Sequence, residues 1–139
     1  MIKKMTNEII DNVLFSDKAF MILFYSQNTQ NMDNIIKIFE GFDEKLQNKV
    51  DVYTCDIENQ VGKLTNYFRM NTLPAMVIMK HNKPYANIAG PASATVYENS
   101  VKDAILKIMQ DEKLIEENKK AYSAKYTPGG GYKTIQMSR

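Results

Sequence analysis

The order of apolar and polar positions along the chain predicts strands separated by turns and helices. A continuous apolar run over residues 19–25 is typical of a strand buried on both faces of its sheet. Residues 50–55 alternate between apolar and polar side chains, which is the pattern of a strand. Residues 75–80 predict a third strand, and the turn at 81–83 leads into a fourth at 84–88. Because this last link is short, the third and fourth strands must form an antiparallel hairpin.

Apolar residues at helical spacing predict four helices, near residues 6–14, 32–42, 58–69 and 96–121. Thr6 is the expected N-cap of the first helix. The residues expected to face the core are Ile9, Ile10, Val13 and Leu14; then Met32, Ile35, Ile36, Ile38, Phe39 and Phe42; then Val61, Leu64, Tyr67 and Phe68; and finally Val101, Ala104, Ile105, Ile108 and Met109. The first two strands are expected to be parallel, with a helical crossover. The sequence therefore predicts an α/β fold with one mixed sheet of about four to five strands flanked by helices.

Length and composition fit a soluble globular protein. A chain of 139 residues with 44% hydrophobic and 24% charged residues can bury the core of one domain. No apolar run approaches the roughly 18 residues that a membrane helix needs, and the start does not resemble a secretory signal. The single cysteine, Cys55, excludes an internal disulfide. We therefore expect a cytoplasmic location, or one within a virus particle, and no membrane partner.

Charge is distributed unevenly and divides the chain. Residues 118–139 carry a charge of +5 and no acid, whereas residues 1–117 sum to −3. Triple glycine at 129–131 is typical of a linker. We therefore predict a domain over residues 1–110 and, over residues 111–139, a helical extension with a basic tail that contains glycine and tyrosine. Such a tail either binds a partner of its own or only keeps the protein soluble.

Four short segments over residues 5–110 resemble the thioredoxin family in order and spacing. They are Phe-Tyr-Ser at 24–26, Cys-Asp-Ile-Glu-Asn at 55–59, Leu-Pro-Ala at 73–75, and Lys-Pro-Tyr-Ala-Asn-Ile-Ala-Gly at 83–90. The resemblance implies a thioredoxin-like fold, whose final strand is followed by a glycine. It also implies a redox motif, Cys-x-x-Cys, between the central strand and the next helix.

The residues that perform dithiol exchange in that family are replaced here. The motif position holds Gln-Asn-Thr-Gln at residues 27–30, whereas the family's nucleophilic thiol needs a thiolate and a second thiol that resolves the mixed disulfide. The buried acid of the family aligns with Leu23, and its lysine aligns with Val52. Cys55 is expected at the end of a strand on the far side of the sheet from the motif loop, as a small buried hydrophobe. We therefore predict a redox-inactive protein that is not an enzyme.

The resemblance implies that Pro74 is cis and exposes the backbone beside the motif, where an extended peptide can pair with a strand edge. The alternative is that the proline serves only packing. The residues predicted to bind a partner in this region are Tyr25, Gln27, Asn28, Thr29, Gln30, Thr72, Leu73, Pro74 and Gly90. The tail is a second candidate surface, since aromatic and basic side chains that alternate can contact nucleic acid or an acidic protein groove. Its candidate contacts are Lys119, Lys120, Tyr122, Lys125, Tyr126, Tyr132, Lys133 and Arg139.

The sequence thus favours a redox-inactive, thioredoxin-like binding or structural subunit of a larger assembly. Its richness in Lys, Ile, Asn and Met is typical of an AT-rich genome, which suggests a bacteriophage component. One alternative is an accessory factor of a nucleic-acid polymerase or a related complex. Another is a thiol-disulfide oxidoreductase that uses Cys55. No cofactor is expected, and His81 lacks the second ligand that a metal site would need.

Overall fold

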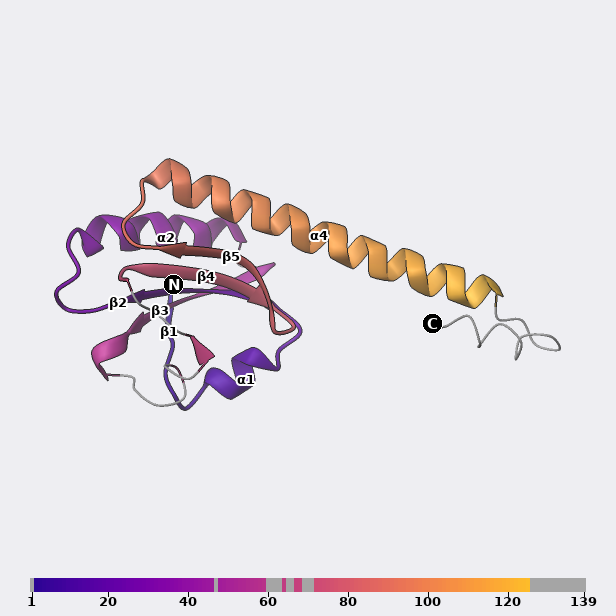
Figure 1. Ribbon diagram of the computed structural model, residues 1–139, viewed down its shortest axis with the longest axis horizontal. Coiled ribbons are helices and arrows are strands. Elements are labelled where there is room, and N and C mark those ends of the chain that lie inside the picture. Colours follow the sequence, from indigo (N-terminus) through magenta and orange to yellow (C-terminus); the bar gives the residue numbers. More distant parts are fainter. Residues whose placement is uncertain (1, 47, 60–63, 65–66, 69–71, 126–139) are drawn as a thin grey trace. The chain divides into compact units, whose positions relative to one another are not determined.

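A five-stranded mixed sheet forms the centre of the fold (Figure 1). The computed structural model describes the chain except for residues 1, 47, 60–63, 65–66, 69–71 and 126–139. The strands are β1 (Lys3–Lys4), β2 (Ala19–Tyr25), β3 (Val50–Asp56), β4 (Ala75–Lys80) and β5 (Lys83–Ala89), in the spatial order β1-β3-β2-β4-β5. Strands β1 and β2 run parallel to β3, whereas β4 is antiparallel to both β2 and β5. The predicted mixed sheet and its hairpin are confirmed.

Helices cover both faces of this sheet. They are α1 (Ile10–Leu14), α2 (Met32–Leu46), the 3₁₀ helix η1 (Ile57–Asn59) and α4 (Ala94–Lys125). Figure 1 shows α1 and α2 on opposite sides of the strands. Because side chains of a strand alternate between faces, the six apolar residues Ala19–Phe24 of β2 contact both layers, and each is at most 2% exposed. The continuous apolar run in the sequence is therefore the signature of the central strand.

The face under α2 is an aromatic core. Phe39 of α2 packs edge-on against Phe42, with ring centroids 5.4 Å apart, and against Tyr97 of α4 at 5.2 Å. All three rings are buried. On the opposite face, Ile10 and Leu14 of α1 join Phe24 of β2 in a second cluster, in which Phe24 and Phe68 lie 5.2 Å apart.

Several local predictions were wrong. Helix α1 begins later than expected, with Ile9 at its N-cap and no side-chain cap, so Thr6 contributes only its carbonyl oxygen, which accepts from Ile9 and Ile10. Tyr67 and Met109, expected in the core, are 50% and 49% exposed. Much of the predicted helix over 58–69 lies outside the described residues, although Leu64 and Phe68 are buried as expected.

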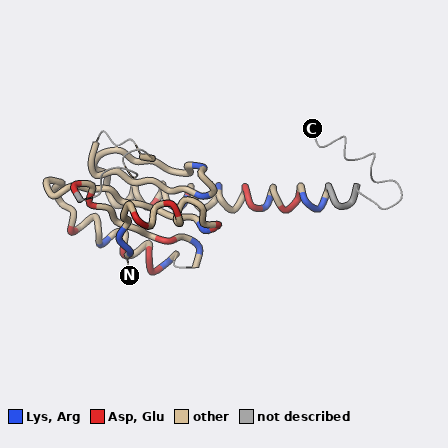
Figure 2. The backbone as a smooth tube through the Cα atoms, turned by 90° about the horizontal axis from the view of Figure 1, so that it is seen from below, with Lys and Arg blue, Asp and Glu red and all other residues tan. Residues whose placement is uncertain are grey.

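The chain divides into two compact units, Met1–Ile105 and Leu106–Arg139. The first unit contains the sheet and the first turns of α4, whose Tyr97, Val101 and Ala104 are buried. In the second unit, acidic and basic residues follow one another along the helix (Figure 2). The predicted division into a domain over residues 1–110 and an extension over residues 111–139 stays a prediction. No helix in the described part of the chain combines the length and apolarity needed to cross a membrane.

Candidate functional site

The segments predicted to bind a partner lie at the end of the sheet where β2, β3 and β5 end and β4 begins. At this edge β2 and β3 end together, because Tyr25 pairs with Asp56. Strand β4 begins there, since Phe24 pairs with Ala75, and β5 ends there, since Ala75 pairs with Ala89. The loop at 27–30, the segment 72–74 and Gly90 therefore follow or precede strand ends on the same edge. We call this region the strand-end site.

The loop between β2 and α2 is held by hydroxyl and carboxylate groups. The Thr29 Oγ1 accepts from the Ser26 backbone N–H at 3.0 Å, and the Thr29 N–H donates to the Ser26 carbonyl at 3.0 Å. The backbone N–H of Gln27 donates to Glu58 Oε1 at 3.2 Å, which ties the loop to η1. The side chains of Gln27, Asn28 and Gln30 remain exposed. The loop thus presents neutral amide groups where dithiol chemistry would need thiols.

The segment before β4 meets the end of β5 through the backbone. The Leu73–Pro74 peptide bond is cis. Gly90 donates its backbone N–H to the Pro74 carbonyl at 2.8 Å. Its φ of +90° lies in the region that favours glycine, and a Cβ there would stand 3.4 Å from Thr72 Cγ2. Pro74 is buried, Leu73 packs against the core and Thr72 is exposed, so this part of the site joins a fixed backbone to an accessible rim.

The two residues that replace the family's proton relay, Leu23 and Val52, are apolar and buried. Leu23 and Val52 are 0% and 1% exposed. Tyr25 is the one titratable residue among those predicted to bind a partner here, and its pKa is raised by burial first, then by the charges of Asp56 and Cys55. A phenol with a raised pKa stays protonated near neutral pH. Tyr25 can therefore donate a hydrogen bond but is not a base.

Cys55 lies near the end of β3, as expected, and the expected parallel crossover makes β3 the immediate neighbour of β2, so that Cys55 pairs with Phe24. The thiol is a core group, 1% exposed, in the cluster that also contains Ile10 and Leu14 of α1. Helix α1 lies on the side of the strands opposite α2, the helix that follows the loop (Figure 1). Burial first, and the charge of Asp56 second, raise the pKa of Cys55 from 9.0 to about 11.

We expect Cys55 to react slowly with thiol reagents in the folded protein. At pH 8 a pKa of about 11 leaves about a hundredfold less thiolate than a pKa of 9.0. Burial lowers the rate further because the reagent must reach the sulfur. Absorbance with a chromogenic disulfide reagent measures this rate, and urea-unfolded protein is the control. Equal rates in the folded and unfolded protein would contradict the placement of the thiol in the core.

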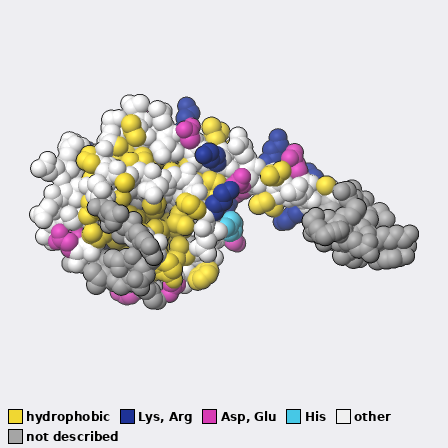
Figure 3. Space-filling view, in the orientation of Figure 1, with side chains coloured by type: hydrophobic (Ala, Val, Ile, Leu, Met, Phe, Trp, Pro, Cys, Tyr) yellow, Lys and Arg dark blue, Asp and Glu magenta, His cyan; other side chains and the backbone are white. Residues whose placement is uncertain are grey.

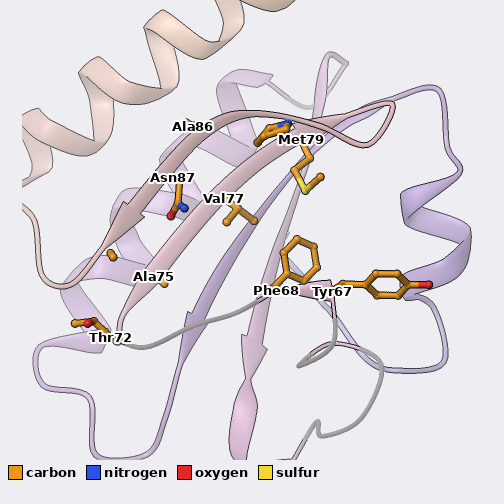
Figure 4. A pocket seen from close by; sticks show the side chains of 10 residues that line it. Tyr67, Phe68, Thr72, Ala75, Val77, Met79, Ala86 and Asn87 are labelled. Atoms are coloured by element: carbon orange, nitrogen blue, oxygen red, sulfur yellow. The ribbon is translucent and has the colours of Figure 1, made fainter.

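An apolar groove that the sequence did not predict lies beside β4 and β5. It has a volume of about 450 Å³ and is lined mainly by Phe68, Ala75, Val77, Met79, Ala86 and Ala89. Figure 4 shows Phe68 and Tyr67 on the side opposite Ala75, Val77 and Met79 of β4, and Figure 3 shows apolar side chains gathered on this part of the first unit. Thr72 belongs to both the rim of this groove and the segment before Pro74. Residues 75–79 are all apolar in the sequence, so no alternation marks the three of them that line the groove.

The predicted tail contacts are only partly described. Lys119 and Lys120 are exposed on α4. Tyr122 and Lys125 belong to the same helix, but their side chains, like Tyr126, Tyr132, Lys133 and Arg139, lie outside the described residues. Among the side chains that the structure does describe, no group of three His, Cys, Asp or Glu residues could hold a metal ion.

Comparison with known proteins bears on the first unit. The family model described as a thioredoxin-like domain matches residues 1–103. Thioredoxin Y, chloroplastic, of Oryza sativa subsp. japonica is 26% identical over 104 residues, which are 74% of this chain. The chain spans 61% of the length of that relative. The matched residues include the whole sheet and the strand-end site.

Proposed function

Because the chain belongs to the thioredoxin-like family but carries a single cysteine, in the core, we propose that it is a non-catalytic subunit of a larger assembly. It binds a protein partner through the strand-end site, with the tail as a second contact. The observation that carries the proposal is the loop at residues 27–30. This loop follows β2 and precedes α2 and contains no thiol.

Dithiol exchange requires chemical groups that the loop at residues 27–30 does not contain. Exchange needs a thiolate that attacks a disulfide and a second thiol that releases the mixed disulfide. Gln27–Gln30 offers amide and hydroxyl groups, which donate and accept hydrogen bonds but are not reducing agents. The sealed positions of Leu23 and Val52 remove the proton relay as well. What the site retains is the capacity to hold a partner.

Backbone geometry supports peptide binding as the mode of contact. Thr72 is exposed at the start of the segment 72–74, and the Gly90 N–H donates to the Pro74 carbonyl at the other end of that segment. An extended peptide that pairs with such a segment gains main-chain hydrogen bonds, while side chains around it set specificity. Gln27, Asn28 and Gln30 stand exposed on the same edge and would contact its polar side chains.

We expect the double substitution Asn28→Arg and Gln30→Arg to abolish partner capture. Two bulky cations at this edge block an approaching backbone, and both positions are exposed, so the fold is left intact. Full-length protein on beads is incubated with an extract of the source, and captured proteins are identified by mass spectrometry. The matched control places the same charge at exposed Asn12 and Asn99 and should capture the wild-type set.

Reductant separates this proposal from thiol chemistry. Non-covalent capture at the strand-end site survives dithiothreitol, because no mixed disulfide is involved. If the N28R/Q30R protein captures the same proteins as its control, the strand-end site is not the contact. If capture disappears under nuclease, the accessory role at nucleic acid replaces the proposal. The origin in a bacteriophage stays a prediction from composition.

A further inference from the structure

The floor of the apolar groove consists of three cross-strand pairs of the β4–β5 hairpin. These pairs are Ala75 with Ala89, Val77 with Asn87, and Met79 with Pro84. Because side chains of a strand alternate between the two faces of a sheet, positions 75, 77 and 79 share one face and stand about 7 Å apart. The floor therefore has a repeat of two residues, which is also the repeat of an extended peptide.

The wall across from β4 is held in place by the core and by α1. Phe68 is 8% exposed and belongs to the cluster against which Val77 and Met79 also pack. The hydroxyl of Tyr67 donates to Asp11 Oδ1 of α1 at 3.1 Å. The rings of Phe68 and Tyr67 lie on the side of the groove across from Val77 and Met79 (Figure 4). The groove is thus largely formed before a ligand arrives.

One end of the groove adjoins the strand-end site. Thr72 lines the groove and is also one of the residues predicted to contact the partner. Ala75, at this end of the floor, directly follows Pro74 in the chain. A peptide that advances about 3.3 Å per residue passes from the strand-end site into the groove within about two residues. The two surfaces are therefore parts of one continuous path.

The lining favours an apolar and uncharged ligand. The groove has a volume of about 450 Å³, which is in the range of pockets that bury small ligands. None of the described residues that line it is charged, so a charged side chain would lose water without gaining a partner. The hydroxyl of Thr72 and the amide of Asn87 both donate and accept hydrogen bonds, as the main chain of a peptide does. An alkyl chain could use neither group.

We propose that the groove binds an uncharged segment of the partner with large apolar side chains at two alternate positions. The proposal rests on the proposed function, because the strand-end site holds the chain that carries these side chains. From Ala75 to Met79 the floor extends about 13 Å, which accommodates two side chains that stand about 7 Å apart. The groove thus determines which peptide is bound, whereas the backbone beside residues 72–74 holds any extended peptide.

Two labelled peptides of the same composition test the spacing. Fluorescence anisotropy measures the binding of the full-length protein to Gly-Ser-Leu-Thr-Leu-Ser-Gly and to Gly-Ser-Leu-Leu-Thr-Ser-Gly. In the first extended peptide both leucines point to one side, whereas in the second they point to opposite sides. The first should bind about tenfold more tightly, because only one leucine of the second enters the groove. Equal affinities would overturn the proposal.

Asn87→Glu tests the place of binding. Asn87 is exposed in the middle pair of the floor, so the substitution puts a carboxylate into the groove and leaves the fold intact. The first peptide should bind this variant about tenfold more weakly. Asn99→Glu adds the same charge at an exposed position of α4 that does not line the groove, and it should bind as the wild-type protein does. Equal binding by the two variants would show that the peptide does not use the groove and would overturn the proposal.

The N28R/Q30R protein separates this proposal from the proposed function. Peptide binding that is lost in N28R/Q30R and kept in N87E would overturn the groove proposal and leave the strand-end site as the contact. Binding that is lost in N87E and kept in N28R/Q30R would support the groove and contradict the proposed function. If neither peptide binds, the proposal is overturned, and a shift of the Met79 methyl resonance on addition of decanol would identify an alkyl chain as the ligand.

Discussion

Phe39→Ala is expected to lower the free energy of unfolding by about 3–5 kcal/mol. Phe39 is 0% exposed and contacts Phe42 and Tyr97 edge-on, so truncation removes its apolar burial and leaves a cavity between α2 and α4. Edge-to-face pairs add to the loss beyond the area that is buried. Because α2 follows the loop at 27–30 directly, its packing also fixes one side of the strand-end site.

The same substitution at Phe15 is the matched control. Phe15 is 76% exposed, so Phe15→Ala should change stability by no more than about 0.5 kcal/mol. Urea denaturation followed by circular dichroism measures both proteins, and the dependence on urea should stay the same if both remain two-state. A loss of similar size at both positions would mean that the Phe39 cluster does not hold α2 on the sheet.

The central part of the fold was predictable from the sequence because its signals are local. The apolar run at 19–25 corresponds to β2, whose residues face helices on both sides. The turn at 81–83 fixed the β4–β5 hairpin, since so short a link allows only antiparallel pairing. Strand β1 was missed because it is only two residues long and because both residues, Lys3 and Lys4, are exposed. Lys3 and Lys4 form a strand because they pair with Tyr53 and Thr54 of β3, which lie far away in the sequence.

The segments of the candidate site were predictable from the sequence, but the contacts between these segments were not. The polar segment 27–30 suggested a loop, but the hydrogen bond from Gln27 to Glu58 depends on β3 lying beside β2. The groove required three elements to come together, with Phe68 opposite strands β4 and β5. Residues so far apart in the sequence carry no common signal until the topology is known.

The full-length protein is expected not to catalyse the reduction of protein disulfides. Catalysis in thioredoxins depends on a thiolate at the start of a helix and on a second thiol nearby. Here the residues before α2 are Gln27–Gln30, and Asn31 begins the first helical hydrogen bond with its carbonyl. Cys55 is 1% exposed, and burial raises its pKa to about 11, so both the access of a substrate and the thiolate fraction near neutral pH are low. The expected difference from an active thioredoxin is therefore the loss of all catalysis.

Insulin reduction by dithiothreitol, followed by turbidity, tests the central claim that this thioredoxin-like domain binds and does not exchange disulfides. An active thioredoxin serves as the positive control, and the Cys55→Ser protein tests the only thiol in the chain. The account predicts that insulin precipitates at the rate set by dithiothreitol alone, with wild-type and Cys55→Ser proteins alike. Acceleration by the wild-type protein that disappears in Cys55→Ser would contradict it and identify Cys55 as a working nucleophile.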